Sequence, residues 1–168
     1  MYNVNVKIMV FTEGTIIMHA SGQNRPRYER VAQVEQKDAA VKNYTTYIPV
    51  GNAVQKISKW HSEGAKIVYL TSRKDRDEVD VIEGVMKKYN FPKGHLEFRR
   101  NDEEYKDVAE RILPDILIED DCESIGGEKE MTYTFVQDDA KKQIKSIPIP
   151  EFGGIDHLPD SLENLKAY

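Results

Sequence analysis

The chain has 168 residues, a length that fits one domain able to bury roughly two-thirds of the surface that its unfolded form exposes. Hydrophobic residues make up 39% of it, charged residues 32%, and the formal net charge is −5, which is typical of a globular protein with a charged surface. The sequence has neither a Lys/Arg run nor the ~20 consecutive apolar residues of a membrane span. We therefore expect no nucleic-acid partner and no membrane partner.

The single cysteine, Cys122, excludes an internal disulfide and fits a reducing compartment. The first residues alternate like a strand and lack the apolar segment and cleavage site of a signal peptide. The sequence therefore favours a cytoplasmic protein.

Apolar residues recur along the chain with the spacings that define strands and helices. Short apolar runs alternate with amphipathic segments, a pattern typical of βαβ units and of a mainly parallel sheet with helices on both faces. The expected elements are, in chain order, a strand at 4–10, a helix at 25–36, a short strand at 44–48, a helix at 49–62, a strand at 66–70, a helix that ends near 89, a strand at 95–98, a helix at 103–112, a strand at 116–118, a helical turn at 137–143, an edge strand at 144–149 and a short helix from 160 or 161.

Residues 16–48 form a polar insert between the first strand and the helix at 49–62. We expect a single domain over residues 1–168, in which this insert makes a small cap or flap. Its arginines, Arg25, Arg27 and Arg30, carry the charge needed to clamp an anion. Because Glu29 is interleaved with them, a solvated helix face is the favoured interpretation.

Polar and acidic side chains follow three of the predicted strands. The sequence Phe11-Thr12-Glu13-Gly14-Thr15 comes after the first strand, Thr71-Ser72-Arg73 after the strand at 66–70, and Asp120-Asp121 after the strand at 116–118. Because ligands of open α/β sheets bind at the carboxyl ends of the strands, we expect these residues to surround one pocket.

The residue types at these strand ends point to a phosphate and a divalent cation. Thr71 and Ser72 offer hydroxyl and backbone N–H groups at a helix start, where anions commonly bind. Arg73, at the rim, is a further candidate for anion binding, and Lys106 lies in the helix before the third strand. Paired carboxylates such as Asp120 and Asp121 suit Mg²⁺, which prefers hard oxygen ligands.

Together these motifs resemble those of the haloacid dehalogenase-like superfamily, whose members are mostly Mg²⁺-dependent phosphatases that work through an aspartyl-phosphate. The resemblance covers the chain from about Val4 to Asp121. It implies a three-layer, Rossmann-like fold and a small cap where the insert lies. The tail at 151–159 is similar to that of an uncharacterised subgroup of this superfamily, a likeness that implies no activity.

The resemblance also implies a role for each motif residue. Glu13 aligns with the general acid/base of the superfamily, Thr71 with its phosphate-binding hydroxyl, and Lys106 with its phosphate-binding lysine. Asp120 and Asp121 align with its metal-binding acids.

The chain departs from this pattern at Phe11, which stands where the superfamily carries its nucleophilic aspartate and a first metal ligand. A phenyl ring has no oxygen with which to attack phosphorus or bind Mg²⁺. We therefore expect a protein that binds a phosphorylated small molecule with little or no hydrolysis, and that holds Mg²⁺ weakly through Asp120 and Asp121. The residues expected at the phosphate are Thr71, Ser72, Arg73 and Lys106.

Two alternatives stay open, and with them the question of whether the protein is an enzyme. One is an active Mg²⁺-dependent phosphohydrolase of non-standard mechanism, in which Glu13, Asp120 and Asp121 hold the metal and activate water. The other is a non-catalytic protein-interaction role with a vestigial pocket. A homodimer is compatible with the sequence, although the sequence shows no isologous patch.

Overall fold

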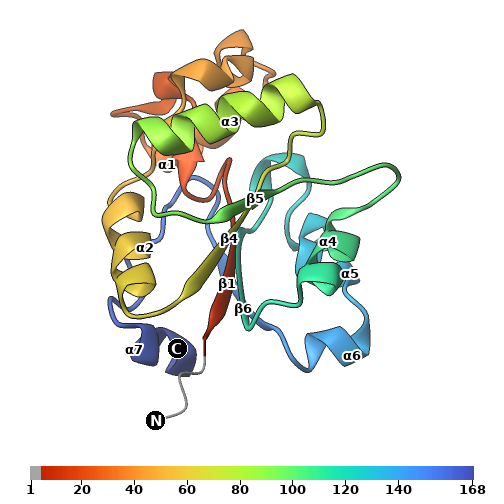
Figure 1. Cartoon of the computed structure of the whole chain (residues 1–168). Helices are drawn as coiled ribbons and strands as arrows, with labels where there is room; N and C mark the ends of the chain where they lie inside the picture. Colours follow the sequence, from red (N-terminus) through yellow and green to blue (C-terminus); the bar gives the residue numbers. More distant parts are fainter. Residues whose placement is uncertain (1–4) are drawn as a thin grey trace.

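Five parallel strands form the central sheet of the computed structural model, which describes residues 5–168 (Figure 1). They lie in the order β5-β4-β1-β6-β7, and β1 is the central strand. The predicted parallel sheet with β7 at its edge is therefore confirmed; position 4 of the first predicted strand lies outside the described residues. The strands are β1 (Lys7–Phe11), β4 (Lys66–Leu70), β5 (His95–Glu97), β6 (Ile116–Asp120) and β7 (Lys145–Ile149).

Helices cover both faces of this sheet, as the sequence predicts. In Figure 1, α2 and α7 lie on one side of the strands and α4, α5 and α6 on the other, while α3 crosses the upper end. The short helix α5 was not expected from the sequence. The helices are α1 (Arg27–Glu35), α2 (Ala53–Ser62), α3 (Arg76–Lys88), α4 (Tyr105–Ile112), α5 (Thr132–Phe135), α6 (Asp138–Lys141) and α7 (Leu162–Ala167).

The central strand divides the hydrophobic core into two layers because successive side chains of a strand point to opposite faces. Ile8 and Val10 pack in the layer that contains the apolar faces of α2, α3 and α7. Met9 and Phe11 pack in the opposite layer with residues of α4. The ring of Phe11 is thus directed by the strand period toward the α4 side of the sheet.

The insert is closed at its base by a two-stranded antiparallel ladder of β2 (Ile17–Met18) and β3 (Ile48–Pro49). Between these strands lie α1, for which Pro26 is the N-cap residue, and three 3₁₀ turns. The turns are η1 (Ala20–Gly22), η2 (Ala39–Lys42) and η3 (Tyr44–Thr46). In Figure 1 the insert lies at the end of the molecule toward which β1 runs.

The strand predicted at 44–48 is wrong over its first three residues, which form η3. The backbone N–H of Thr46 donates to the carbonyl oxygen of Asn43 at 3.1 Å, and its hydroxyl donates to the same oxygen at 2.8 Å. The hydroxyl of Thr45 donates to Asn43 Oδ1 at 2.7 Å. These local bonds give the backbone an alternative to strand pairing, which outweighs the β propensity of tyrosine and threonine.

The helix predicted at 49–62 begins only at Ala53. Gly51 has a φ of +54°, a conformation that no helix interior adopts, and Asn52 is held by Asp156 of the tail. Its backbone N–H donates to Asp156 Oδ1 at 2.8 Å. The helix boundary is therefore set by a contact that lies more than a hundred residues away in the sequence.

The tail after β7 packs along α2 and ends in α7. The ammonium group of Lys56 donates to the carbonyl oxygen of Leu158 at 2.7 Å, and the indole N–H of the fully buried Trp60 donates to that of Pro159 at 3.0 Å. The tail begins at the carboxyl ends of the strands, where the N–H of Phe152 donates to the carbonyl oxygen of Gly14 at 2.8 Å. Over the part of the chain described, no helix is long and apolar enough to cross a membrane.

Candidate functional site

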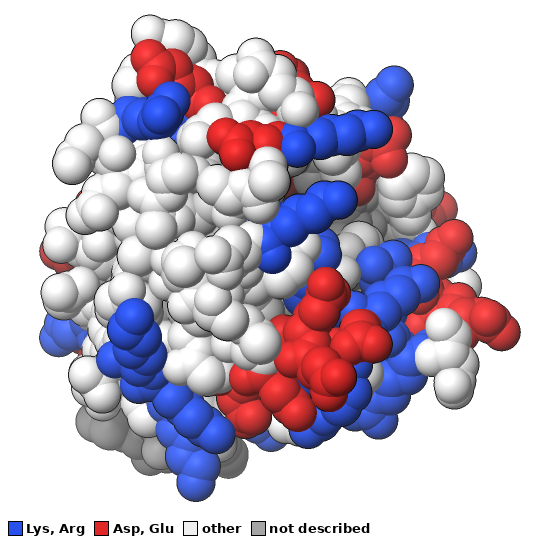
Figure 2. Space-filling model, turned by 90° about the horizontal axis from the view of Figure 1, so that it is seen from above, with Lys and Arg blue, Asp and Glu red and all other residues white. Residues whose placement is uncertain are grey.

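A cavity of about 300 Å³ lies at the carboxyl ends of β1, β4 and β6. The strand ends contribute Phe11, Glu13, Ser72, Arg73 and Asp120 to its wall. The insert, α4 and the tail contribute further residues, among them Tyr44, Tyr47, Tyr105, Glu151 and Phe152. Figure 2 looks onto this end of the molecule, where acidic and basic side chains gather next to each other beside a broad uncharged area. Three of the predicted strand ends thus surround one pocket.

Thr71, Ser72 and Arg73 form an anion cradle after β4, and the carboxylate of Glu13 lies in it. The hydroxyl of Thr71 donates to Glu13 Oε1 at 2.6 Å, and the backbone N–H of Ser72 donates to Oε2 at 3.3 Å. The guanidinium Nε of Arg73 is 3.5 Å from Oε1, and the hydroxyl of Thr12 donates to Oε2 as well. Three of the four residues predicted to bind phosphate, Thr71, Ser72 and Arg73, therefore contact a carboxylate of the chain itself.

Arg73 joins this cradle to the insert. Its guanidinium donates to the hydroxyl of Tyr44, and its central carbon lies 4.6 Å from the centre of the Tyr44 ring. The same guanidinium donates to Ser72 Oγ at 2.9 Å. Arg73 is thus shared between the Thr71-Ser72-Arg73 motif and the insert.

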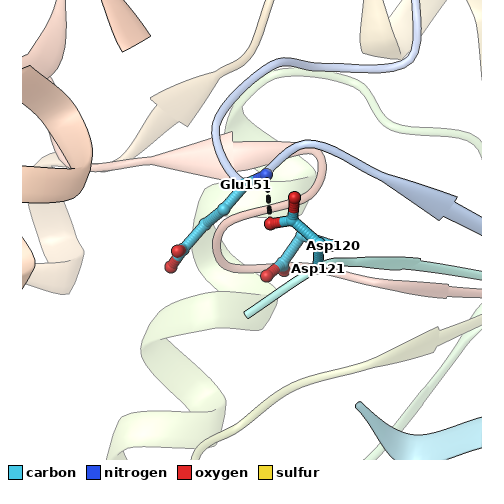
Figure 3. A group of neighbouring side chains, drawn as sticks. All are labelled: Asp120, Asp121 and Glu151. Carbon is cyan, nitrogen blue, oxygen red and sulfur yellow. Dashed lines mark hydrogen bonds between the residues drawn. The ribbon is translucent and has the colours of Figure 1, made fainter. Parts of the chain in front are cut away.

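Asp120, Asp121 and Glu151 form an acidic cluster, and two of its members, Asp120 and Glu151, line the cavity (Figure 3). Each offers a carboxylate oxygen, and the three oxygens lie within 4.8 Å of one another. In Figure 3 the two aspartates emerge from the end of β6 and Glu151 from the segment after β7, with its backbone N–H donating to Asp121 Oδ1 at 3.1 Å. The structure thus brings the predicted metal-binding pair together with a third carboxylate.

Hydrogen bonds and a close approach to Gly14 hold Asp120 next to the first motif. The hydroxyl of Thr15 donates to Asp120 Oδ2 at 3.0 Å, and the N–H of Cys122 donates to Oδ1 at 3.0 Å. Gly14 has a φ of +86°, and a Cβ atom at this position would lie 2.9 Å from Asp120 Oδ2. Glycine is therefore required here both by the backbone conformation and by the close approach of the carboxylate.

Burial and the repulsion between neighbouring carboxylates raise the pKa values of two acids of the cluster, Asp120 and Glu151. Loss of hydration raises the pKa of Asp120 to about 6, with a smaller contribution from the neighbouring carboxylates. The same two causes raise the pKa of Glu151 to about 7, although its oxygens accept hydrogen bonds from the N–H and the hydroxyl of Ser124 at 2.7 and 2.8 Å. A nearby cation would stabilise the charged forms of both acids.

The donor set of the cluster fits a divalent cation of the Mg²⁺ type. Hard carboxylate oxygens from three residues converge, and Mg²⁺ is commonly held by one or two carboxylates together with waters and substrate phosphate. Glu119, which precedes the cluster, points elsewhere, and its carboxylate accepts the backbone N–H groups of Thr132 and Tyr133, each at 3.0 Å. It therefore caps the start of α5.

Phe11 lines the cavity at the end of the central strand and is 8% exposed. Its ring packs edge-to-face on Tyr105 of α4, with the ring centres 5.3 Å apart. The position thus offers an apolar surface to the cavity and no group that could act as a nucleophile or a ligand.

Lys106, Arg27 and Arg30 contact groups outside the anion cradle. The ammonium group of Lys106 is 3.7 Å from Glu104 Oε2, and Lys106 is not among the residues that form the cavity wall in the described chain. Arg27 pairs with Glu123, and Arg30 donates to the carbonyl oxygen of Phe152 at 2.9 Å. These two arginines therefore fasten the insert to the loop after β6 and to the tail.

Sequence reasoning missed Tyr44, Tyr47 and Tyr105 of the cavity wall, and it also missed Glu151 and Phe152. Both directly follow the segment that ends β7, so they obey the same rule as the three motifs recognised from the sequence: a polar or aromatic side chain after a parallel strand. The signal was present, because the strand at 144–149 was predicted. Applying the strand-end rule to this fourth strand would have found Glu151.

No protein-family model and no curated protein sequence matches this chain. Solved structures do match. A haloacid dehalogenase-like family hydrolase from Streptococcus pneumoniae is 11% identical, with a TM-score of 0.52, over 100% of this chain and 92% of that one. A chain of the Pnkp1/Rnl/Hen1 RNA repair complex is 12% identical, with a TM-score of 0.49, over 89% of this chain and 44% of that one. A universal stress protein in complex with cAMP reaches a TM-score of 0.36 at 12% identity, over 87% and 95% of the two chains.

The fold is haloacid dehalogenase-like. At 11% identity the match to the Streptococcus pneumoniae hydrolase shows the fold alone, here a parallel five-stranded sheet with helices on both faces. The chain spans less than half the length of the RNA-repair chain that it matches.

Proposed function

We propose that this chain is a haloacid dehalogenase-like protein of a subgroup in which Phe11 replaces the nucleophile, and that it binds a phosphorylated small molecule together with Mg²⁺. One observation carries the proposal: the donors of Thr71, Ser72 and Arg73 converge on an anion, the Glu13 carboxylate, in the same cavity as the acidic cluster. An anion site and a cation site side by side are what a metal-bound phosphate requires.

The charge of the cavity makes the cation essential for this binding. Five acidic residues and one basic residue, Arg73, lie in the wall; the acids are Glu13, Glu119, Asp120, Glu130 and Glu151. A phosphate dianion would meet net repulsion in such a cavity unless a divalent cation in the acidic cluster offset it. We therefore expect phosphate binding to depend strictly on Mg²⁺.

Little or no hydrolysis is expected from this site. Phe11 supplies no oxygen, and the carboxylate of Glu13 is engaged by Thr71, Ser72 and Arg73 instead of facing a substrate freely. A rate enhancement by covalent catalysis needs an activated nucleophile at this point. The insert, by covering the strand ends and contacting Arg73 through Tyr44, acts as the cap of the pocket.

Calorimetric titration tests the proposal. Inorganic phosphate and a panel of phosphate monoesters are titrated into the protein with saturating Mg²⁺ and again with a chelator. Binding is expected with Mg²⁺ and is expected to disappear with the chelator. In Asp120→Asn, which keeps the size of the side chain, both Mg²⁺ binding and phosphate binding should weaken together.

A turnover assay completes the test. Release of phosphate from the same esters should stay near the uncatalysed rate in the native protein. If no phosphate compound binds with saturating Mg²⁺, the proposed function is wrong. If hydrolysis is rapid and disappears in Glu13→Gln, the alternative of an active phosphohydrolase is correct instead.

A further inference from the structure

Aromatic rings are concentrated in the wall of the cavity. Aromatic residues make up 9% of the chain, whereas five of the 19 residues in this wall are Phe or Tyr. They come from four separate parts of the sequence: the end of β1, the insert, the start of α4 and the tail. These residues are Phe11, Tyr44, Tyr47, Tyr105 and Phe152. Convergence from four segments indicates that this surface belongs to the pocket and not to one helix face.

Four of these rings form two pairs. Phe11 and Tyr105, from the sheet and α4, have ring centres 5.3 Å apart and planes at 68°. Tyr44 and Tyr47, from the insert, have ring centres 5.3 Å apart and planes at 59°. The first pair belongs to the body of the fold and the second pair to the insert, so both parts of the protein give the cavity aromatic surface.

An arginine holds one ring of each pair in place. The guanidinium carbon of Arg99 lies 4.0 Å from the centre of the Tyr105 ring, and that of Arg73 lies 4.6 Å from the centre of the Tyr44 ring. Arg99 also donates to the carbonyl oxygen of Ser72 at 3.3 Å. Rings fixed in this way lose little entropy when a ligand arrives, which favours tight contact with a rigid group.

The aromatic pairs adjoin the anion cradle. Burial raises the pKa of Tyr105 and of Tyr47, and in both cases Glu13 adds to the shift while Arg73 opposes it. The charged groups of the cradle are therefore within electrostatic reach of one ring from each pair. A ligand with its phosphate at the cradle would place its organic part among these rings.

We propose that the ligand of this pocket is a phosphate monoester whose organic part is an aromatic ring system without further negative charge, held against the Phe11–Tyr105 pair and the Tyr44–Tyr47 pair. This inference rests on the proposed function and names its substrate class. A cavity of about 300 Å³ has room for a ring and a phosphate, since roughly 150 Å³ suffices for benzene. The acids of the wall, Glu119, Glu130 and Glu151, disfavour organic groups with a further negative charge.

Two esters of similar size test the inference. Phenyl phosphate and cyclohexyl phosphate differ mainly in the flatness and π-system of the ring, and each is titrated calorimetrically with saturating Mg²⁺. Phenyl phosphate is expected to bind about tenfold more tightly, which corresponds to about 1.4 kcal/mol. In Tyr105→Leu the preference should fall to about threefold or less, while affinity for inorganic phosphate stays within about twofold. In Tyr44→Leu the preference should fall in the same way.

Tyr28→Leu is the matched control, because Tyr28 is 68% exposed on α1 and lies outside the cavity wall. It should leave the preference unchanged. Equal affinity of the two esters overturns the inference and leaves the proposed function standing, because phosphate binding would persist. Loss of the preference in Tyr28→Leu as well would also overturn it. Absence of binding by both esters and by inorganic phosphate overturns the proposed function itself.

Discussion

The anion cradle and the acidic cluster differ in how their negative charge is compensated. In the anion cradle, the Glu13 carboxylate has a hydroxyl at 2.6 Å, a backbone N–H at 3.3 Å and a guanidinium at 3.5 Å, so its charge is compensated inside the protein. In the acidic cluster, the hydrogen bonds that the carboxylates of Asp120 and Glu151 accept within residues 5–168 come from neutral groups, and burial raises the pKa of both.

This difference indicates how the anion cradle and the acidic cluster would each respond to a bound ion. The cradle is balanced by an anion of its own, so an incoming phosphate must displace or share the position of Glu13. The cluster has excess negative charge, and a divalent cation would lower its free energy. Binding of a phosphate and of Mg²⁺ should therefore be coupled, since each ion improves the site of the other.

The largest effect is expected from Phe11→Asp, which places a carboxylate between the anion cradle and the acidic cluster. Removal of the buried ring from its contact with Tyr105 should lower the free energy of unfolding by about 3–5 kcal/mol. With Mg²⁺ present, the new carboxylate joins the cluster and offers a nucleophile, so phosphate release from esters should rise above the native level. Denaturant unfolding and a phosphate-release assay measure the two effects.

Phe11→Asn is the control for this variant. It removes the ring and adds a polar group of the same size, so it should lose similar stability without gaining activity. If Phe11→Asp folds and binds Mg²⁺ but its activity equals that of Phe11→Asn, the remaining site residues are not arranged for phosphoryl transfer.

Glu151→Gln tests the acidic cluster. Removal of one of three clustered carboxylates should weaken Mg²⁺ binding about 30-fold, or about 2 kcal/mol, because the ligand charge on the cation falls. Glu130→Gln is the matched control, since Glu130 lies in the cavity wall but outside the cluster. Equal weakening in both variants would show a general charge effect and would remove Glu151 from the cation site.

The fold could be predicted from the sequence because its signals are local. The strand at 66–70 and the edge strand that contains Pro148 were visible as apolar runs with clear ends. The start of α2 was missed because Asp156, far away in the chain, holds Asn52. A local sequence pattern does not show a contact between residues so far apart in the chain. The start of this helix is therefore determined by tertiary structure.

The candidate site was predictable to the level of strand ends and no further. That Asp120 lies at the same edge of the sheet as Gly14 follows from the parallel topology, which the sequence predicts. The engagement of Glu13 by Thr71, and the departure of Lys106 toward Glu104, depend on side-chain conformations that spacing does not determine. Residue type therefore predicted which side chains lie at the strand ends, whereas the partner of each side chain is determined by tertiary packing.

Glu13→Gln tests the cradle. The amide keeps the shape of the side chain but removes the charge that competes with phosphate for Thr71, Ser72 and Arg73. Affinity for inorganic phosphate at saturating Mg²⁺ should rise about tenfold, or about 1.4 kcal/mol. Glu78→Gln is a suitable control, because Glu78 is 3.8 Å from Arg73 but outside the cavity wall. An unchanged or weaker affinity in Glu13→Gln would contradict competition by the carboxylate.

The smallest predicted effect is on the free energy of unfolding at acid pH. His19 of the insert lowers it as the pH falls, whereas Asp120 and Glu151 raise it. Burial lowers the pKa of His19, whose Nε2 shares a hydrogen bond with Gln33 at 2.9 Å. Asp38 opposes this shift, whereas Arg25 and Arg30 add to it. Below its unfolded pKa of 6.5, the unfolded chain therefore takes up a proton at this residue before the folded chain does, and acid destabilises the fold. Asp120 and Glu151, with raised pKa values, take up protons first in the folded chain and act the other way.

The two contributions can be separated by comparing His19→Asn with the native protein. Between pH 6.5 and 5.5 the native protein should lose up to about 1 kcal/mol of unfolding free energy through His19, and the variant should not. The acidic cluster is common to both proteins, so its opposite contribution cancels in the difference between the two denaturant-derived stability curves. His61→Asn, at an exposed position of α2, should follow the native curve. Parallel curves for the native protein and His19→Asn would mean that His19 takes up its proton equally in the folded and unfolded chains, and the acid response would then belong to the carboxylates alone.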